Sequence, residues 1–130
     1  MTRFSFKWLA AFAAFSLLSV AAFAQTSGPA AQISLGVTPT VATAGGTVTV
    51  FGSITNTSSK AEKVTINYDV VGPCNYTDNY TLKVSLRAGE TRTLSTSETV
   101  PSCAGDYTIT ATAISGSTVL DVKSVTVTAQ

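Results

Sequence analysis

The sequence predicts an all-β protein, with seven antiparallel strands in a β-sandwich preceded by a cleaved signal peptide. Alternating apolar and polar residues recur along most of the chain after Gln25, and turn-forming residues separate these runs. No stretch of about ten residues after Gln25 has a helical period. Short strands at regular spacing with turns between them are typical of a sandwich or a small barrel.

The first 24 residues have the layout of a secretory signal peptide. A positively charged start is followed by an apolar run from Trp8 to Val20, and Ala22-Phe23-Ala24 then places small residues before the expected cleavage site. The alternative is a retained membrane anchor, but this run is short for a bilayer core that needs roughly 20 residues. We therefore expect a secreted, periplasmic or cell-surface protein.

Cleavage after Ala24 would leave 106 of the 130 residues, enough for one domain with a single core. Residues 25–31 are expected to be a flexible lead-in, and residues 32–130 the domain. This part keeps six of the eight Lys and Arg and all seven Asp and Glu, a formal net charge of −1. Neither sign clusters along the sequence, so no basic stripe indicates nucleic acid or an anionic membrane.

In the first half of the domain, turn residues separate three predicted strands. Ala44-Gly45-Gly46 precedes the alternation of Thr47–Val50, and Thr57–Lys60 precedes that of Val64–Val70, which Gly72-Pro73 ends. The β-branched side chains of these runs suit a buried face and the Thr and Asn side chains a wet one. The predicted strands of this half cover residues 32–38, 46–56 and 62–71.

The second half continues the pattern. Tyr80–Leu86 alternates clearly, Arg87–Glu90 is a turn, and Tyr107–Ala111 alternates again before the turn at Ser115-Gly116-Ser117. The last run changes parity between Val122 and Val125, which predicts a β-bulge or a break there. The predicted strands of this half cover residues 79–87, 91–99, 106–114 and 118–128.

Three stretches carry a resemblance to a known group: TPTVATAGGTVTVFGSITNTSSKAEKVTINYDV, LRAGETRTLSTSETV and AGDYTITATA. They resemble the bacterial immunoglobulin-like modules of the cell-adhesion-related (CARDB) type, which are similar to fibronectin type III folds. The resemblance covers roughly residues 33–128. It implies a seven-stranded immunoglobulin-like β-sandwich with a role in display or adhesion, and it supplies no catalytic residue. In such a fold, Ala104–Ile109 fits a tyrosine corner, with the Tyr107 hydroxyl reaching back to the backbone.

Cys74 and Cys103 are the only cysteines, and the signal peptide would direct them to an oxidising compartment. Cys74 follows the third predicted strand and Cys103 follows the fifth, so both lie at the same end of an antiparallel sandwich. In the immunoglobulin order the third and sixth strands are neighbours, which predicts a disulfide between the two loops. The chain-entropy model gives such a bridge roughly 3 to 4 kcal/mol. A nucleophilic thiolate, the alternative, lacks a histidine to activate it.

The segment GPCNYTDNY, residues 72–80, supplies the candidate binding surface, which consists of Asn75, Tyr76 and Asp78. If the disulfide fixes the neighbouring Cys74, residues 75–79 are expected to form an ordered turn. Tyr76 would then offer an exposed aromatic face to a sugar ring or to an apolar side chain of a partner. Tyr80 shares the alternation of the strand that follows and is expected to face the core.

Two weaker surface patterns are also present. Asn75, Asp78 and Asp106 could share one end and hold calcium, but the sequence has no dense carboxylate motif, and no metal or cofactor is predicted. A threonine array could bind ice or a crystalline polysaccharide, although threonine simply favours the solvated face of a strand. The array consists of Thr108, Thr110, Thr112, Thr126 and Thr128.

Asn56, Asn75 and Asn79 each begin the acceptor pattern for N-glycosylation. In a chain so rich in Ser and Thr, chance matches to this pattern are expected. The pattern matters only in a eukaryotic protein, whereas the resemblance points to bacteria.

The residue inventory argues against most enzyme mechanisms, so the protein is not expected to be an enzyme. The chain has no histidine, and its two cysteines are assigned to a disulfide. The seven carboxylates are scattered, with no pair obviously placed for glycoside hydrolysis. No glycine-rich phosphate loop precedes a helical pattern.

Two functions remain. The leading prediction is a secreted or periplasmic non-catalytic module that binds a cell-surface or extracellular component, either polysaccharide or protein. The alternative is a structural subunit of a fibre or surface layer that assembles through its edge strands. A monomer or weak self-association is expected, and neither nucleic acid nor a membrane is an expected partner after signal removal.

Overall fold

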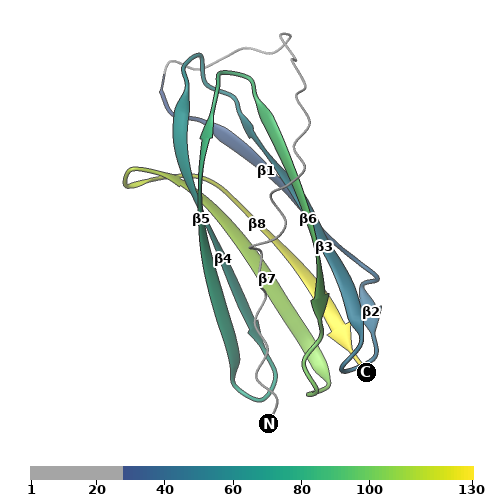
Figure 1. Cartoon of the computed structure of the whole chain (residues 1–130). Helices are drawn as coiled ribbons and strands as arrows, with labels where there is room; N and C mark the ends of the chain where they lie inside the picture. The colour runs from purple at the N-terminus through teal and green to yellow at the C-terminus, as the bar shows by residue number, and fades with distance from the viewer. Residues whose placement is uncertain (1–27) are drawn as a thin grey trace.

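The computed structural model describes residues 28–130, which form two β-sheets packed face to face (Figure 1). The predicted signal peptide, residues 1–24, and the first residues of the predicted lead-in lie outside this described part. The strands are β1 (Ala31–Thr38), β2 (Val41–Ala42), β3 (Thr47–Asn56), β4 (Glu62–Gly72), β5 (Tyr76–Leu86), β6 (Thr91–Thr99), β7 (Gly105–Ser115) and β8 (Thr118–Ala129).

The predicted all-β sandwich is confirmed, and it contains one strand more than the seven predicted. One sheet has the order β1-β3-β6 and the other the order β2-β8-β7-β4-β5. All neighbouring strands are antiparallel except β2 and β8, which are parallel. The additional strand is β2, the short segment that follows Pro39. Because proline has no N–H with which to continue a ladder, the chain leaves the first sheet after Thr38 and joins β8 of the second.

Most strand boundaries lie within one residue of the prediction, but β5 begins at Tyr76 and not at residue 79. The Tyr76 N–H donates to the Pro73 carbonyl at 3.2 Å, and the two residues between them, Cys74 and Asn75, have φ angles of 58° and 55°. Two consecutive positive φ values at the central residues of a turn are typical of type I′, here over residues 73–76. The expected turn over residues 75–79 is therefore wrong. The polar residues of this segment have low strand propensity. They are nevertheless part of β5, because the tight turn before Tyr76 brings them into pairing with β4.

The predicted irregularity in the last strand is also misplaced. Pairing between β7 and β8 is regular from Val122 to Val125, and the register shifts instead at Leu120, which lies between the partners of Ala113 and Ile114. Val122 is on the outer face and 49% exposed. An exposed valine in the outward position produces the apparent change of parity in the sequence.

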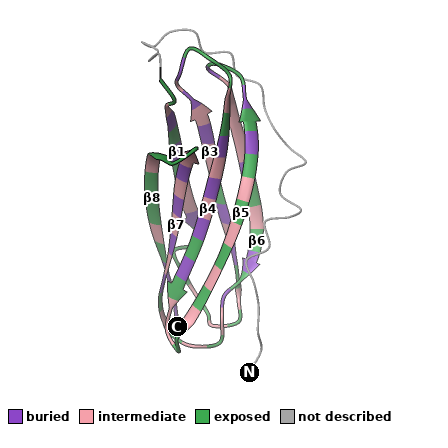
Figure 2. Ribbon diagram, turned by 90° about the vertical axis from the view of Figure 1, so that its left-hand side faces the viewer, coloured by how far each residue is buried: buried purple, intermediate pink, exposed green. Residues whose placement is uncertain are grey.

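Between the sheets lies one apolar core, and the strands alternate between buried and exposed residues around it (Figure 2). Burial of these side chains provides the main driving force for folding. The fully buried residues are Val48, Val50 and Ile54 of β3, Val64 and Ile66 of β4, Leu86 of β5, Tyr107, Ile109, Ala111 and Ala113 of β7, and Val127 of β8, with Val100 after β6. Ala31, predicted to belong to the lead-in, is the first residue of β1 and is buried.

Candidate functional site

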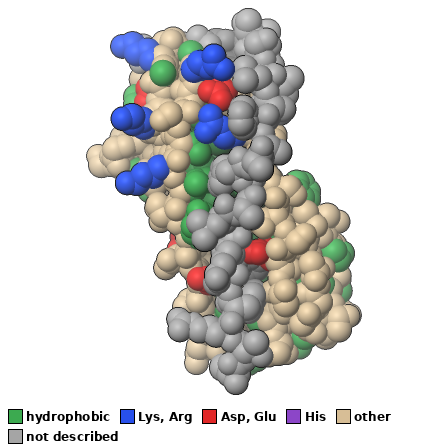
Figure 3. All heavy atoms as spheres, viewed as in Figure 1, with side chains coloured by type: hydrophobic (Ala, Val, Ile, Leu, Met, Phe, Trp, Pro, Cys, Tyr) green, Lys and Arg blue, Asp and Glu red, His purple; other side chains and the backbone are tan. Residues whose placement is uncertain are grey.

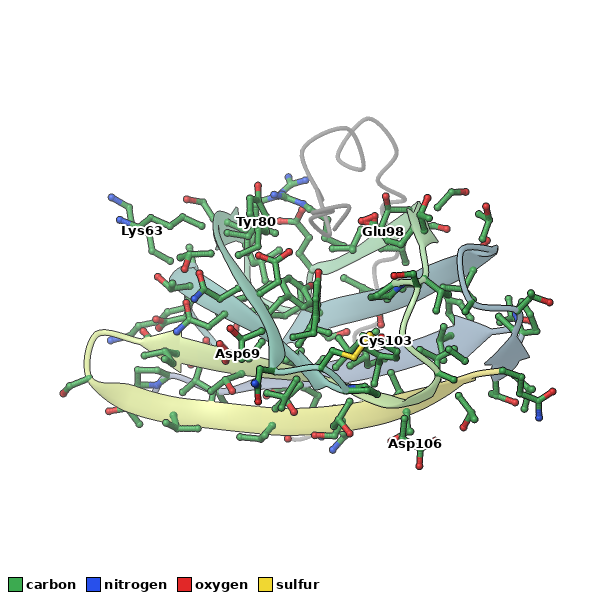
Figure 4. The ribbon with its side chains drawn as sticks, turned by 90° about the horizontal axis from the view of Figure 1, so that it is seen from below. Lys63, Asp69, Tyr80, Glu98, Cys103 and Asp106 are labelled. Carbon is green, nitrogen blue, oxygen red and sulfur yellow. A yellow bond between two sulfur atoms is a disulfide. The ribbon has the colours of Figure 1, made fainter. Side chains whose placement is uncertain are left out.

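One end of the sandwich, which we call the cysteine end, contains the β4–β5 turn and the β6–β7 loop. A disulfide joins Cys74 to Cys103 there, with the two Cα atoms 6.4 Å apart (Figure 4). The Tyr107 hydroxyl donates to the Cys103 carbonyl oxygen at 2.7 Å, while its fully buried ring packs against Gly72. A Cβ at position 72 would collide with that ring, so only glycine fits.

The three residues of the predicted binding surface are differently placed. Asn75 is exposed in the turn, whereas Tyr76 and Asp78 point from β5 toward the inner side of its sheet and are half-buried. The Tyr76 ring packs edge to face on Tyr107, with centroids 5.8 Å apart, and its hydroxyl donates to Asp78 Oδ2 at 3.5 Å. Burial, and then the negative charge of Asp78, raises the pKa of Tyr76 above its usual range. Tyr76 therefore offers less of its ring to a partner than the sequence suggests.

The arrangement does not favour the calcium site considered above. Asp106 projects from the outer face of β7, away from the disulfide, and its Oδ1 accepts a hydrogen bond of 2.6 Å from the Thr128 hydroxyl (Figure 4). Asp78 lies on the inner side of β5, facing another direction. Among residues 28–130 there is no group of three or more Asp, Glu or Cys residues that could hold a metal ion.

A surface that sequence reasoning missed is the outer face of the three-stranded sheet, which we call the Phe51 face. Its side chains form rows across the strands, and all are uncharged. They are Gln32, Ser34, Gly36 and Thr38 of β1, Thr47, Thr49, Phe51, Ser53 and Thr55 of β3, and Thr91, Thr93, Ser95, Ser97 and Thr99 of β6.

Phe51 stands at the centre of this face and is 44% exposed. Its ring extends across β1, over Gly36, where it occupies the space that a Cβ would take. Beside it lies a shallow depression of about 440 Å³, lined by Phe51 and by the hydroxyls of Ser53, Thr93 and Ser95 among others. Val48 and Val50 are both buried, so the alternation of β3 turns the side chain of the next residue, Phe51, outward. Alternation in the sequence could therefore have revealed this exposed ring.

The outer face of the five-stranded sheet differs from the Phe51 face. It carries the predicted threonine array on β7 and β8, but charged side chains interrupt it, as does the exposed Val122. The charged residues on this face are Lys63, Asp69, Lys83 and Asp106.

The opposite end, which we call the Asn56 end, contains the β3–β4 and β5–β6 connections. Asn56 is fully buried there. Its Nδ2 lies 2.8 to 3.1 Å from the carbonyl oxygens of Lys60, Leu86 and Arg87, and its Oδ1 accepts hydrogen bonds from the N–H and hydroxyl of Ser58. An amide nitrogen enclosed in this way cannot carry a glycan in the folded protein. Asn75 and Asn79, which begin the other two acceptor patterns, are exposed.

Charge is also distributed unevenly between the ends, although neither sign clusters along the sequence. Lys and Arg side chains gather at the Asn56 end, the upper part of Figure 3. The basic residues there are Lys60, Lys63, Lys83, Arg87 and Arg92, and the half nearer the cysteine end holds Asp69, Asp78, Glu98 and Asp106. Strand ends that are distant in sequence meet in the sandwich, which linear spacing does not reveal.

Within the described residues there is no helix that could cross a membrane. No protein-family model matches the sequence, and no curated protein matches it.

Solved structures with a similar fold include a CARDB domain from Pyrococcus furiosus, solved in complex with di-metal ions. It has a TM-score of 0.66 and 16% identity, and the match covers 84% of this chain and 95% of that one. Two larger proteins also match, each over a smaller share of its own length. The alkylpurine DNA glycosylase AlkC of Pseudomonas fluorescens, bound to DNA containing an abasic site analogue, has a TM-score of 0.60 and 16% identity over 77% of this chain and 30% of its own.

A β-glucosidase from Erythrobacter marinus has a TM-score of 0.60 and 12% identity, over 78% of this chain and 16% of that one. This chain thus spans less than a third of both enzymes, but nearly the whole length of the CARDB domain. At these identities the matches establish the fold alone. The described chain is an immunoglobulin-like β-sandwich with the fold of a CARDB-type domain.

Proposed function

We propose that this protein is an extracytoplasmic, non-catalytic module of the adhesion type that binds a neutral polysaccharide through the Phe51 face. The observation that carries this proposal is an exposed aromatic ring at the centre of an uncharged surface lined with hydroxyl groups.

The chemistry of this face matches that of a sugar chain. The face of an aromatic ring is negatively polarised, so it attracts the weakly positive C–H groups on the flat side of a pyranose. Hydroxyls at Ser53, Thr93 and Ser95 can donate and accept hydrogen bonds around the Phe51 ring. A shallow site with an apolar ring and a few polar groups is typical of ligand recognition. The absence of charged side chains from the face favours a neutral glycan over an ionic one.

The location and the non-catalytic role have separate support. The N-terminal sequence is typical of a secretory signal peptide, and the disulfide is compatible with an oxidising compartment. The chain has no histidine, and its described carboxylates include no cluster suited to a metal. A CARDB-type fold is consistent with a role in adhesion, as an analogy from the fold.

A depletion assay tests the proposal. Oxidised protein, expressed from its full gene into an oxidising compartment, is mixed with cellulose, with chitin and with the insoluble polysaccharide of the producing cell's envelope. We expect saturable binding to at least one of the three. Phe51→Ala should weaken it by at least about tenfold, as expected for an aromatic hot spot, and Phe51→Trp should retain it.

Val122→Ala is the matched control, because Val122 is similarly exposed but lies on the outer face of the other sheet. Its binding should equal that of the unaltered protein. Phe51→Ala protein that is folded and binds as tightly as the unaltered protein would contradict the proposal, as would failure to bind any of the three polysaccharides.

One observation favours a second function, that of a structural subunit. β5 is an 11-residue strand at the end of its sheet, and it pairs only with β4. An edge of this length can add a strand from a second copy. Size-exclusion chromatography at increasing concentration tests this alternative, which requires concentration-dependent assembly and would be contradicted by a monomer at high micromolar concentration.

A further inference from the structure

Four exposed cations lie together at the Asn56 end, and we call this surface the basic end. It consists of Lys60 in the β3–β4 connection, Lys63 near the start of β4, Lys83 near the end of β5, and Arg87 just after β5. The register pairs Lys63 with Ser85, so Lys63 and Lys83 are diagonal neighbours on the outer face of adjacent strands. Side chains in that relationship are about 7 to 8 Å apart.

The acidic residues of this end neutralise only part of its positive charge. Glu90 has only 9% of its side chain exposed, and it binds the Arg92 guanidinium at 2.9 Å, the Arg87 N–H at 2.8 Å and the Arg87 Nε at 3.8 Å. Glu62 accepts a hydrogen bond of 3.4 Å from the Ser115 hydroxyl. Counting both carboxylates against Arg92 and the four exposed cations leaves a net charge of +3 at this end.

The remaining charges lie elsewhere. Lys123 and Asp121 pair with each other at 3.4 Å on β8, so they contribute no net charge. The other four carboxylates lie in the half nearer the cysteine end and give it a net charge of −4. The formal charge of −1 over the domain therefore conceals two ends of opposite sign. A distribution of this kind orients a protein toward an anionic partner before contact.

The backbone of the basic end is held in place by one buried side chain. Asn56 Nδ2 lies 2.8 Å from the carbonyl oxygen of Lys60 and 3.1 Å from that of Arg87, so it joins the two connections that carry these cations. The Asn56 carbonyl in turn accepts the Gly89 N–H at 2.9 Å. Because the backbone is fixed before binding, less conformational entropy is lost when an anion is captured.

The side chains around these cations indicate which class of anionic partner the basic end can bind. Of the exposed large apolar residues of the described chain, only Val119 lies toward this end, on β8 beyond β7, and a single valine is too little to anchor in a bilayer. The basic end also contains none of the aromatic rings on which single-stranded nucleic acid would stack. The predicted export of the protein favours a polymer that is found outside the cytoplasm.

We infer that the basic end binds an anionic polysaccharide, one that bears carboxylate or phosphate groups along its chain. Lys63 and Lys83 contact successive anionic groups, and Lys60 and Arg87 extend the contact around the end of the sandwich. This site is separate from the Phe51 face, so either site can fail its test without affecting the other.

The probes are polygalacturonate as a carboxylated glycan and dextran sulfate as a glycan of higher charge, with neutral dextran as the uncharged reference. Binding is measured by calorimetry on the oxidised protein at about 50 mM and about 500 mM salt. We expect both anionic glycans to bind at low salt and neutral dextran not to bind. Affinity should fall at least about tenfold at the higher salt, since exposed charges are screened.

The paired substitution Lys63→Gln with Lys83→Gln should weaken binding by at least about tenfold, and Lys63→Arg with Lys83→Arg should retain it. The matched control is Thr77→Glu with Thr126→Glu, which lowers the net charge by the same two units on exposed positions away from the basic end. That control should bind within about twofold of the unaltered protein.

Four results would overturn the inference. They are absence of binding to both anionic glycans at low salt, full binding by the folded Gln variant, an equal loss in the Glu control, and tighter binding to duplex DNA or to anionic lipid vesicles than to either glycan.

Discussion

The two ends of the sandwich are stabilised by different means. At the cysteine end a covalent bond joins Cys74 to Cys103, and the Tyr107 hydroxyl adds a hydrogen bond to the same loop. At the Asn56 end there is no disulfide, and one buried amide binds the carbonyls of two separate connections. The cysteine end lies in the acidic half, whereas the Asn56 end is basic.

This difference shows two ways of stabilising loops that lie outside the apolar core. A disulfide acts mainly by restricting the unfolded chain, so its contribution depends on redox conditions and very little on pH. A buried amide acts in the folded state, where it supplies several hydrogen bonds to separate segments at once. The Asn56 end should therefore be the more sensitive to substitution, and the cysteine end the more sensitive to reductant.

The largest effect is expected for Asn56→Ala. It removes the side-chain hydrogen bonds to Ser58 and leaves the carbonyls of Lys60, Leu86 and Arg87 without this partner. We expect the free energy of unfolding to fall by about 4 to 5 kcal/mol, because a fully buried side chain and all of its hydrogen bonds are lost at once. Urea denaturation followed by circular dichroism measures this change. A loss below about 1 kcal/mol would mean that the Asn56 end is held by something else.

Loss of the disulfide should have the next largest effect. Cys74 and Cys103 are 29 residues apart in sequence, and opening that loop should lower the free energy of unfolding by about 3 to 4 kcal/mol. The paired substitution Cys74→Ser with Cys103→Ser, and reduction of the unaltered protein, should give the same value in urea denaturation. Reduction should not change the stability of the paired variant. An equal response of this variant to reductant would refute the assignment of the effect to the disulfide.

A smaller effect at the same end is expected for Tyr107→Phe. The substitution keeps the ring against Gly72 but removes the hydrogen bond to the Cys103 carbonyl. We expect a loss of about 1 to 2 kcal/mol from a partly buried acceptor that loses this donor. Because this hydroxyl and the disulfide act on one loop, the losses from Tyr107→Phe and from reduction should not be additive in a double-mutant cycle. Simple additivity would show that the two act independently.

The smallest effect is expected for Glu90, whose contribution to stability makes the Asn56 end sensitive to pH. The Arg87 N–H is the main cause that lowers the pKa of this carboxyl below 4.5, and Arg92 adds to it, while burial acts in the opposite direction. A carboxyl with a lowered folded-state pKa contributes stability above its unfolded-state pKa. That contribution is lost as the pH falls through the folded-state value.

We therefore expect Glu90→Gln to cost about 1 kcal/mol at pH 7 and less as the pH falls below about 4. Thermal unfolding of both proteins between pH 7 and pH 2 measures the difference. A difference that stays constant over the whole range would exclude the ionised carboxylate as its source.

Much of the fold could be predicted because alternation is a local property. Val64–Val70 indicated a strand from its own residues, and β4 extends one residue beyond the predicted end. The two-residue strand β2 carries no such pattern, since it is defined only by its pairing with β8. The start of β5 was missed because the tight turn at Cys74 and Asn75 outweighs the low strand propensity of the residues that follow.

The candidate sites depended on contacts between distant segments. Strand parity, which predicted that the two cysteines meet, also places Lys63 beside Lys83 and could have revealed the basic end. Parity likewise turns Phe51 outward. The role of Asn56 had no such signal, because two of its carbonyl partners, Leu86 and Arg87, lie 30 and 31 residues away. A glycosylation pattern was the only local feature of that residue.

The most direct measurement is the binding isotherm of the oxidised protein on insoluble polysaccharide, with Phe51→Ala and Val122→Ala measured beside it. If the Phe51 face is the contact surface, the unaltered protein and Val122→Ala bind saturably with equal affinity, and Phe51→Ala binds at least about tenfold more weakly. Equal binding by all three proteins, with each of them folded, would contradict the assignment of function to that face.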